Sequence, residues 1–328
     1  RGHRVSSGAP PDLAALGEEG RPRGPVDRPV HAASPRQGAV GGGDDGVHLL
    51  AGDVPVHPVG ACVGGFFRAP EQPEVDHVLE QLHAALPEAE ELVAWSAALP
   101  IPDDQQAFTS VSLRHDTDYP LAEGRIVSDA GLDIPVDRVE QHFSEEHRPQ
   151  STALFSLLDG KPYLVGPLAR LNLNLDRLPA SSLALLKQSG IPFPNGNMFL
   201  SLFARALEIH IAIVEAIRLL EAYRQPSRPH TEVKVKAGVG YGATEAPRGL
   251  LWHRYEVDRD GLISAARIVP PTSQNQARIE TDLHDSLMSF GLQQADDALR
   301  LRAETVIRNY DPCISCATHF LKIDAKRR

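Results

Sequence analysis

The spacing of apolar residues predicts three helical regions. In residues 74–86, apolar residues recur at helical spacing and acidic or polar residues fill the opposite face, which predicts an amphipathic helix. Pro87 is expected to end this helix. Residues 199–223 have few polar interruptions on one face, which predicts a long helix in the core. Its expected core positions are Leu202, Phe203, Ala206, Ile209, Ile213, Val214, Ile217 and Leu220. A third helical stretch is expected over residues 278–310, broken near Gly291.

Short strands are expected between these helices. Residues 151–174 read as strands on either side of a turn at Asp159-Gly160-Lys161-Pro162. Residues 232–269 are strand-like and are interrupted by several glycines. In Val63-Gly64-Gly65-Phe66-Phe67, two glycines allow a tight backbone approach, and the adjacent aromatic residues are expected to be buried. The pattern predicts long helices together with small sheets.

Composition narrows the class of protein. The 328 residues are 42% hydrophobic, which is enough for a sizeable core, and the formal charge of -10 argues against nucleic acid as a partner. Three cysteines make no disulfide framework, and no apolar run approaches the ~20 residues of a membrane helix. We therefore expect a cytoplasmic protein. Residues 1–46 are rich in Gly, Pro and Arg and contain no aromatic Phe, Trp or Tyr, so we expect them to be disordered or out of frame.

The segment Asp311-Pro312-Cys313-Ile314-Ser315-Cys316-Ala317-Thr318-His319 carries the clearest chemistry. It places two thiols one helical turn apart, with a carboxylate before them and an imidazole after them. Thiolates are soft metal ligands, and Pro312 ends the upstream helix, so the pair is presented at a chain reversal. The spacing fits one shared metal, but a zinc half-site and a redox pair have the same spacing.

Two other segments have candidate binding chemistry. Arg248 follows a glycine-rich stretch that is expected to be a backbone-accessible loop, where a guanidinium could face an anion. The segment Val269-Pro270-Pro271-Thr272-Ser273-Gln274-Asn275 clusters hydroxyls and amides that could hold a small anion. The alternatives are a surface arginine in a turn and a capped loop before the helix at Arg278.

Taken in order, these segments resemble the large, catalytic subunit of nickel-iron hydrogenases. The C-terminal motif is similar to that family's metal motif, Glu245-Ala246-Pro247-Arg248-Gly249 to its arginine loop, and Val269-Pro270 to Asn275 to its cyanide-facing loop. Gly166-Pro167-Leu168-Ala169-Arg170 and His57-Pro58-Val59 also match. Among the branches of the family, the residues of the C-terminal motif are most similar to those of the cytoplasmic, bidirectional, NAD(P)-linked branch. The resemblance implies a mainly α fold with small β-sheets (α+β).

The resemblance also implies roles for named residues. Cys313 would be a terminal nickel thiolate, and Cys316 would bridge nickel to an iron that carries CO and cyanide. Arg248, oriented by Asp311, would lie over the open metal position and accept or relay a proton, with Cys313 as the rival acceptor. The iron's diatomic ligands would be enclosed by Pro247 with Thr272 or Ser273, and His319 would bind Mg2+ or Fe2+. The implied reaction is reversible heterolytic cleavage of H2.

The resemblance implies partners and processing as well. Electrons would pass to an iron-sulfur small subunit and then to NAD(P)-reducing flavin and iron-sulfur subunits, because this chain has no cluster-binding cysteine set. Residues 47–319 would form the hydrogenase-like domain, and residues 320–328 would be an extension that a maturation protease removes.

The sequence departs from the family pattern toward the N-terminus, where the proton-relaying glutamate and the acidic magnesium ligand are missing. The second cysteine pair expected near the N-terminus is missing as well, so we expect the chain as given to be N-terminally incomplete or frameshifted, and inactive without that pair. Three alternatives are open: a metal-free hydrogenase-like scaffold or electron-transfer subunit, an inactive fragment, and a zinc-binding interaction protein.

Overall fold

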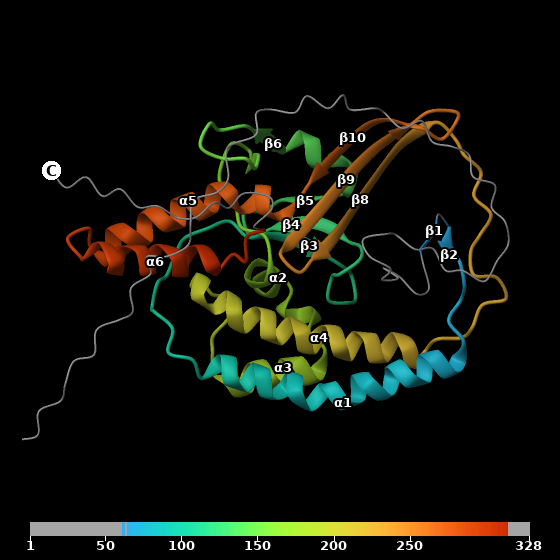
Figure 1. Ribbon diagram of the computed structural model, residues 1–328, viewed down its shortest axis with the longest axis horizontal. Helices are drawn as coiled ribbons and strands as arrows, with labels where there is room; N and C mark the ends of the chain where they lie inside the picture. Colours follow the sequence, from blue (N-terminus) through green and yellow to red (C-terminus); the bar gives the residue numbers. More distant parts are fainter. Residues whose placement is uncertain (1–60, 63, 314–328) are drawn as a thin grey trace, which may run out of the picture. The chain divides into compact units, whose positions relative to one another are not determined.

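The computed structural model describes residues 61–62 and 64–313, which combine helices with four small antiparallel sheets (Figure 1). The helices are α1 (Gln72–Ala97), α2 (Pro167–Leu173), α3 (Ala180–Ser189), α4 (Ser201–Glu221), α5 (Pro271–Phe290) and α6 (Asp296–Arg308). Short 3-10 helices are η1 (Val136–Gln141), η2 (Leu175–Arg177) and η3 (Met198–Leu200). The expected mainly α fold with small sheets is confirmed.

Each sheet has only two or three strands. The strands are β1 (Ala61–Cys62), β2 (Gly65–Phe66), β3 (Val111–Arg114), β4 (Arg125–Ser128), β5 (Asp133–Ile134), β6 (Phe143–Glu146), β7 (Phe155–Leu158), β8 (Gly238–Ala246), β9 (Gly249–Val257) and β10 (Ile263–Val269). The sheets are β1-β2, β3-β4-β5, β6-β7 and β10-β9-β8. In the last of these, β8 and β9 form a hairpin in the register Ala246↔Gly249.

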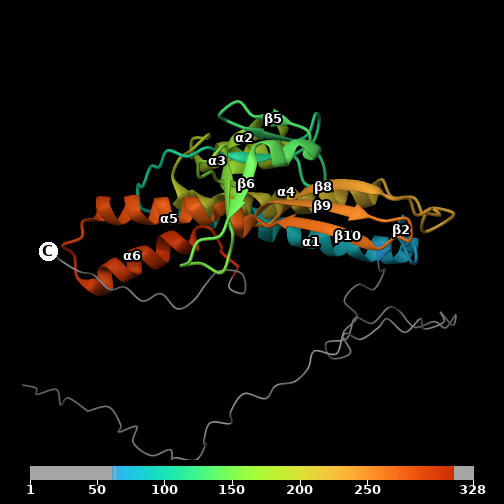
Figure 2. The ribbon, with the colours of Figure 1, turned by 90° about the horizontal axis from the view of Figure 1, so that it is seen from above.

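The helix α1 packs along α4, and α3 packs against both (Figures 1 and 2). The prediction that Pro87 ends α1 is wrong, because the helix continues through it to Ala97. Proline removes one backbone hydrogen bond from the helix. The turns beyond Pro87 bury Ala89 and Val93, and Val93 joins the same hydrophobic cluster as α4, so packing outweighs the lost bond.

The long helix predicted over residues 199–223 is confirmed as η3 and α4, but the predicted core face is partly wrong. Leu202 and Ile209 are 42% and 47% exposed. The buried positions are Ser201, Phe203, Ala204, Ala206, Leu207, His210, Ile211 and Ile217. A helix that is apolar on most sides does not reveal from sequence which stripe its neighbours will cover.

Two predictions in the middle of the chain need correction. Residues 167–173 form the helix α2, although residues 151–174 were expected to be strands; β7 and the turn at Asp159 and Gly160 are present. Pro167 starts α2, since a proline at the first helical position loses no intrahelical bond. The side chains of Phe66 and Phe67 are 49% and 56% exposed, and not buried as expected.

The helix expected to begin at Arg278 begins seven residues earlier, at Pro271. Thr272, Ser273, Gln274 and Asn275 therefore lie in the first turns of α5, and not in a loop before it. Pro271 at the start of the helix explains the early boundary. The break near Gly291 is confirmed, because α5 ends at Phe290.

The core consists of two principal clusters that meet at residues 164 and 165. Leu164 belongs to the cluster between the helices, which also contains Phe203 and Leu207 of α4. Val165, the next residue, belongs to the cluster between the sheets, with Trp252 of β9. The candidate site lies at this junction. No helix among the described residues is long and apolar enough to cross a membrane.

Candidate active site

Arg248 lies in the tight turn that joins β8 to β9. The glycine-rich stretch before it was expected to be a loop, but it forms strand β8. Gly249, at φ 138°, follows the turn, and a Cβ there would lie 2.6 Å from Val165 Cγ2. Gly166, at φ 115°, begins α2, and its Cβ would lie 2.8 Å from the Arg248 carbonyl oxygen. Both positions therefore require glycine, and the turn rests on the start of α2.

The segment that follows α6 is fixed to α4 and α5. The Asn309 carbonyl oxygen accepts from Ser201 Oγ and from Arg205 Nη2, both at 2.6 Å. The buried Tyr310 hydroxyl donates to Asp282 Oδ2 at 3.0 Å. Burial raises the pKa of Asp282, and its hydrogen bond with Tyr310 opposes that shift. These contacts set the position from which Asp311 and Cys313 continue.

The structure brings Arg248 and Asp311 into contact. Arg248 Nε donates to the Asp311 carbonyl oxygen at 2.6 Å and lies 3.1 Å from Asp311 Oδ2. The two side chains are 45% and 46% exposed. Asp311 has φ 47°, a left-handed conformation that is uncommon outside glycine and costs roughly 1–3 kcal/mol. The conformation allows both its carbonyl and its carboxylate to meet the same guanidinium.

A small cavity lies beside Arg248. Its lining residues are Leu164, Val165, Pro167, Leu168, Met198, Ser201, Arg205, Arg248, Asn275, Asn309 and Tyr310. One wall is therefore apolar and the other carries guanidinium and amide N–H groups. This lining, within the described part of the chain, does not include Pro247, Thr272 or Ser273.

Two buried N–H donors of side chains that line this cavity have no acceptor among the described residues. They are Arg205 Nε and Asn309 Nδ2. Burial lowers the pKa of Arg205, and the charge of Asp311 opposes that shift. A buried unsatisfied donor costs roughly 1–3 kcal/mol, so two of them beside one cavity indicate a place for an acceptor or an anion.

These donors and the apolar wall fit small diatomic ligands on a metal. Cys313, partly exposed and two residues beyond Asp311, brings one thiol to the same end of the chain. Cys316 and His319 lie outside the described residues. Within residues 61–62 and 64–313, no group of three His, Cys, Asp or Glu residues could hold a metal ion. The described residues thus fit the surroundings of such a group and one of its thiolates.

The other predicted site residues have structural contacts. The Pro247 carbonyl oxygen accepts from Arg170 Nη2 at 3.3 Å. Ser273 Oγ donates to the Pro270 carbonyl oxygen at 2.9 Å, and Thr272 is buried. Their roles around the iron ligands stay predictions.

The amides of Gln274 and Asn275 bind backbone groups of the protein. Asn275 accepts from the Val165 N–H at 2.9 Å and donates to the Val165 carbonyl at 3.0 Å. Gln274 Nε2 donates to the carbonyl oxygens of Val269 and Leu250. Both amides were expected to point into a pocket, and Asn275 does line the cavity. Through the hydrogen bonds given above, both side chains also connect α5 to the elements around the Arg248 turn.

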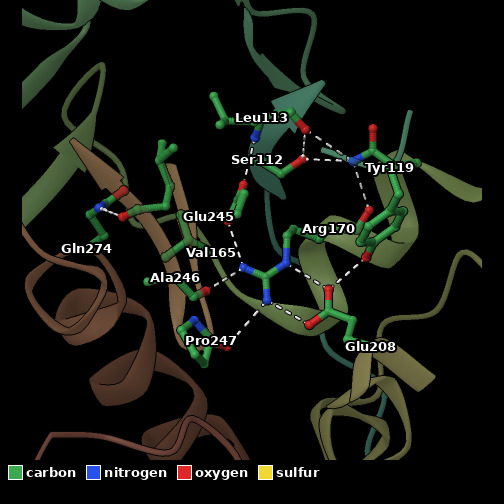
Figure 3. A network of polar contacts seen from close by, with 12 residues as sticks. Ser112, Leu113, Tyr119, Val165, Arg170, Glu208, Glu245, Ala246, Pro247 and Gln274 are labelled. Atoms are coloured by element: carbon green, nitrogen blue, oxygen red, sulfur yellow. Dashed lines mark hydrogen bonds and ion pairs between the residues drawn. The ribbon is translucent and has the colours of Figure 1, made fainter. Parts of the chain in front are cut away.

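Sequence reasoning gave Arg205 no role and noted Arg170 only as part of a motif. The available signal for Arg205 was an arginine between two alanines in a helix expected to lie in the core. Arg170 makes a buried cluster behind the turn, and its side chain is 3% exposed (Figure 3).

Comparison with known proteins gives the family. Residues 158–319 match the model of the nickel-dependent hydrogenases. This part of the chain belongs to the nickel-dependent hydrogenase family. The chain is similar to the sulfhydrogenase 1 subunit alpha of Pyrococcus furiosus, with 32% identity over 280 residues, covering 84% of this chain and 64% of that subunit. It also resembles the NAD-reducing hydrogenase HoxS subunit beta of Cupriavidus necator, with 30% identity over 55% of this chain and 40% of that subunit.

Solved hydrogenase structures have the same fold. An NAD+-reducing NiFe hydrogenase in the H2-reduced state matches with a TM-score of 0.62 and 26% identity, covering 78% of this chain and 62% of that one. A NiFeSe hydrogenase variant from Desulfovibrio vulgaris Hildenborough matches with a TM-score of 0.61 at 20% identity, covering 78% of this chain and 63% of that one. The chain thus spans less than two thirds of the length of these relatives.

Proposed function

We propose that this chain is the catalytic large subunit of a nickel-iron hydrogenase that cleaves H2 reversibly and heterolytically into protons and electrons. The observation that carries the proposal is the Arg248–Asp311 contact beside a cavity with two unsatisfied donors, two residues before Cys313. Family membership of residues 158–319 supports it.

The proposed metal ligands are Cys313 and Cys316, with His319 binding Mg2+ or Fe2+. The thiolates of Cys313 and Cys316 would together hold the nickel-iron group. When bound, the nickel-iron group with its CO and cyanide ligands would supply the redox chemistry that polarises H2. Pro247 and Thr272 or Ser273 would enclose the diatomic ligands.

The protein side chains would handle the proton. The Arg248 guanidinium would supply positive charge and N–H donors next to the reacting atoms, and it would accept or relay the proton. Asp311 holds it in place through the two contacts described above. The Cys313 thiolate is the rival to Arg248 as the group that accepts the proton.

We also propose partner subunits for this chain, on the basis of its similarity to NAD+-reducing hydrogenases. An iron-sulfur small subunit would take the electrons, and flavin and iron-sulfur subunits would deliver them to NAD(P) in the cytoplasm. A maturation protease would remove residues 320–328. H2-dependent reduction of NAD+ or NADP+ by the co-purified complex tests this assignment, and a complex that reduces only an artificial dye contradicts it.

Metal analysis tests the function directly. The full chain is co-expressed with the maturation machinery and small subunit, and nickel and iron are quantified together with the infrared bands of CO and cyanide. With the missing N-terminal cysteine pair restored, we expect nickel, iron and both bands in the subunit and in its Cys62→Ser variant, the matched thiol control, and their loss in Cys313→Ser and Cys316→Ser. One tightly held zinc with no nickel would instead support the zinc-binding alternative.

A further inference from the structure

The Arg170 guanidinium is the centre of a buried cluster behind the Arg248 turn (Figure 3). Its Nε and Nη2 donate to the two carboxylate oxygens of Glu208 at 2.7 and 2.6 Å. Its Nη1 donates to Glu245 Oε2 at 2.7 Å. The Glu245 side chain is fully buried and that of Glu208 is 13% exposed, so one guanidinium pairs with two carboxylates that are shielded from water.

The same guanidinium also binds the backbone of the turn. Its Nη1 donates to the Ala246 carbonyl oxygen at 2.7 Å, and its Nη2 donates to the Pro247 carbonyl oxygen at 3.3 Å. These are the last two carbonyl groups before Arg248. Guanidinium can reach two carboxylates and two carbonyls at once because its N–H groups lie in a rigid planar fork; a lysine ammonium cannot.

We infer that Arg170 is the positioning residue of the turn: it fixes the two peptide groups that carry Arg248 and thereby sets where Arg248 meets Asp311. The inference rests on the proposed function, since a fixed Arg248 matters only if that residue acts at the site. Arg170 itself does not line the cavity, so it acts through the turn.

The far side of the cluster holds Arg170 in place. The Tyr119 hydroxyl donates to Glu208 Oε1 at 2.7 Å, and Glu245 Oε1 accepts from the Leu113 N–H at 2.7 Å. Burial, then the charge of Glu208, raises the pKa of Tyr119, so the phenol remains a donor. Burial alone would lower the pKa of Arg170, but the two carboxylates raise it, so the cation persists. The cluster ties α2, α4, β3 and β8 to one point.

Hydrogen exchange on the full chain tests the inference without any metal. Arg170→Lys keeps the charge but cannot make all the bonds. We expect amides of residues 246–250 to exchange about tenfold faster, the factor for losing one charge-assisted hydrogen bond, after correction for global unfolding. Arg302→Lys is the matched control, because Arg302 is a largely buried guanidinium paired with Asp104 and Ser286, away from the turn. This control should leave exchange at residues 246–250 unchanged.

A side-chain readout reports on Arg248 itself. Phenylglyoxal modifies accessible guanidinium groups, and mass spectrometry gives the rate at each arginine. In Arg170→Lys, we expect Arg248 to react faster relative to the exposed Arg259, because its contact with Asp311 is no longer held. A cluster that serves only to pack helices would leave this ratio unchanged, and that result overturns the inference.

A second variant tests the inference if Arg170→Lys fails to fold. Glu208→Gln removes one carboxylate that holds Arg170 but does not touch the turn, and it should raise exchange at residues 246–250 by a smaller factor. Unchanged exchange in every folded variant overturns the inference. Absence of nickel with a loosened turn would refute the proposed function alone, whereas bound nickel with an unchanged turn would refute the positioning role alone.

Discussion

The two sides of the Arg248 turn differ in how completely their polar groups are bonded. Behind the turn, Arg170 has two carboxylates and two carbonyls within hydrogen-bond distance. Toward the cavity, Arg205 and Asn309 each keep a buried N–H without an acceptor. Each side contains an arginine from a helix, Arg170 of α2 behind the turn and Arg205 of α4 at the cavity. Only Arg170 has a hydrogen-bond acceptor for each of its side-chain nitrogens.

This difference in hydrogen bonding distinguishes the residues that support the candidate site from the residues that form it. A folded chain rarely leaves buried donors unpaired, because each costs roughly 1–3 kcal/mol. Donors that stay unpaired next to a cavity are best explained by a bound group that accepts from them. The four predictions that follow test this contrast, beginning with the largest effect.

Removing the cation from the saturated side should be most damaging. Arg170→Met leaves Glu208 and Glu245 buried without their partner, and we expect the free energy of unfolding to fall by roughly 3–5 kcal/mol in urea titrations. Arg125→Met, which breaks an ion pair between half-exposed side chains, should cost about 0–1 kcal/mol. Equal losses in the two variants would mean that the cluster contributes no more than a surface pair.

Arg248→Lys should show the opposite behaviour. We expect H2 oxidation by the assembled enzyme to fall about 100-fold, because the site loses a preorganised donor. The free energy of unfolding should change by less than about 0.5 kcal/mol, since the side chain is 45% exposed. Activity assays and urea titrations on the same preparation measure both. A variant that unfolds easily and remains active would contradict the assignment of this side to function.

Asn309→Ala tests the unsatisfied donor. The carbonyl oxygen of residue 309, which binds Ser201 and Arg205, is retained, and the side-chain amide with its buried Nδ2 is lost. We expect the metal-free protein to be unchanged or more stable, by up to about 1 kcal/mol in thermal or urea unfolding. A loss of more than about 1 kcal/mol in the free energy of unfolding would show that the Asn309 side chain has a partner within the protein. It would then not be available to a bound group.

The smallest effect concerns pH. Burial raises the pKa of Asp282 above its usual 3.8, so the native state binds this proton more tightly than the unfolded state. Stability from this group is present at low pH and is lost as pH rises from about 4 through the raised value. Asp282→Asn should flatten that part of the curve of unfolding free energy against pH, measured from pH 4 to 7. A curve that coincides with that of the unsubstituted chain would argue against a buried proton at this anchor.

Local sequence patterns predicted the elements better than their contacts. The helix at residues 199–223 and the strands within residues 232–269 follow from periodicity and glycine spacing. The stop at Pro87 and the strand after Gly166 were wrong, because packing of α1 on α4 and the proline at the start of α2 override the local preference. Which face of α4 is buried also depended on its neighbours.

For the candidate site, the motifs located Arg248 and Asp311, which the structure brings together. They gave no indication of the cavity lined by Arg205 and Asn309. These two residues lie more than 100 positions apart in sequence, and each looks ordinary within its own helix or helix end.

The sequence alone determined which chemical groups are present: two thiols, an aspartate and an imidazole near the carboxy end, and Arg248 followed by a glycine. Their spacing is a property of neighbouring residues, so it can be read from the chain directly. Only the tertiary structure decided that Arg170 of α2 binds carboxylates 38 and 75 residues away and that two donors remain unpaired beside Arg248. Such contacts arise when separate helices and strands pack around a shared core, which no local pattern specifies.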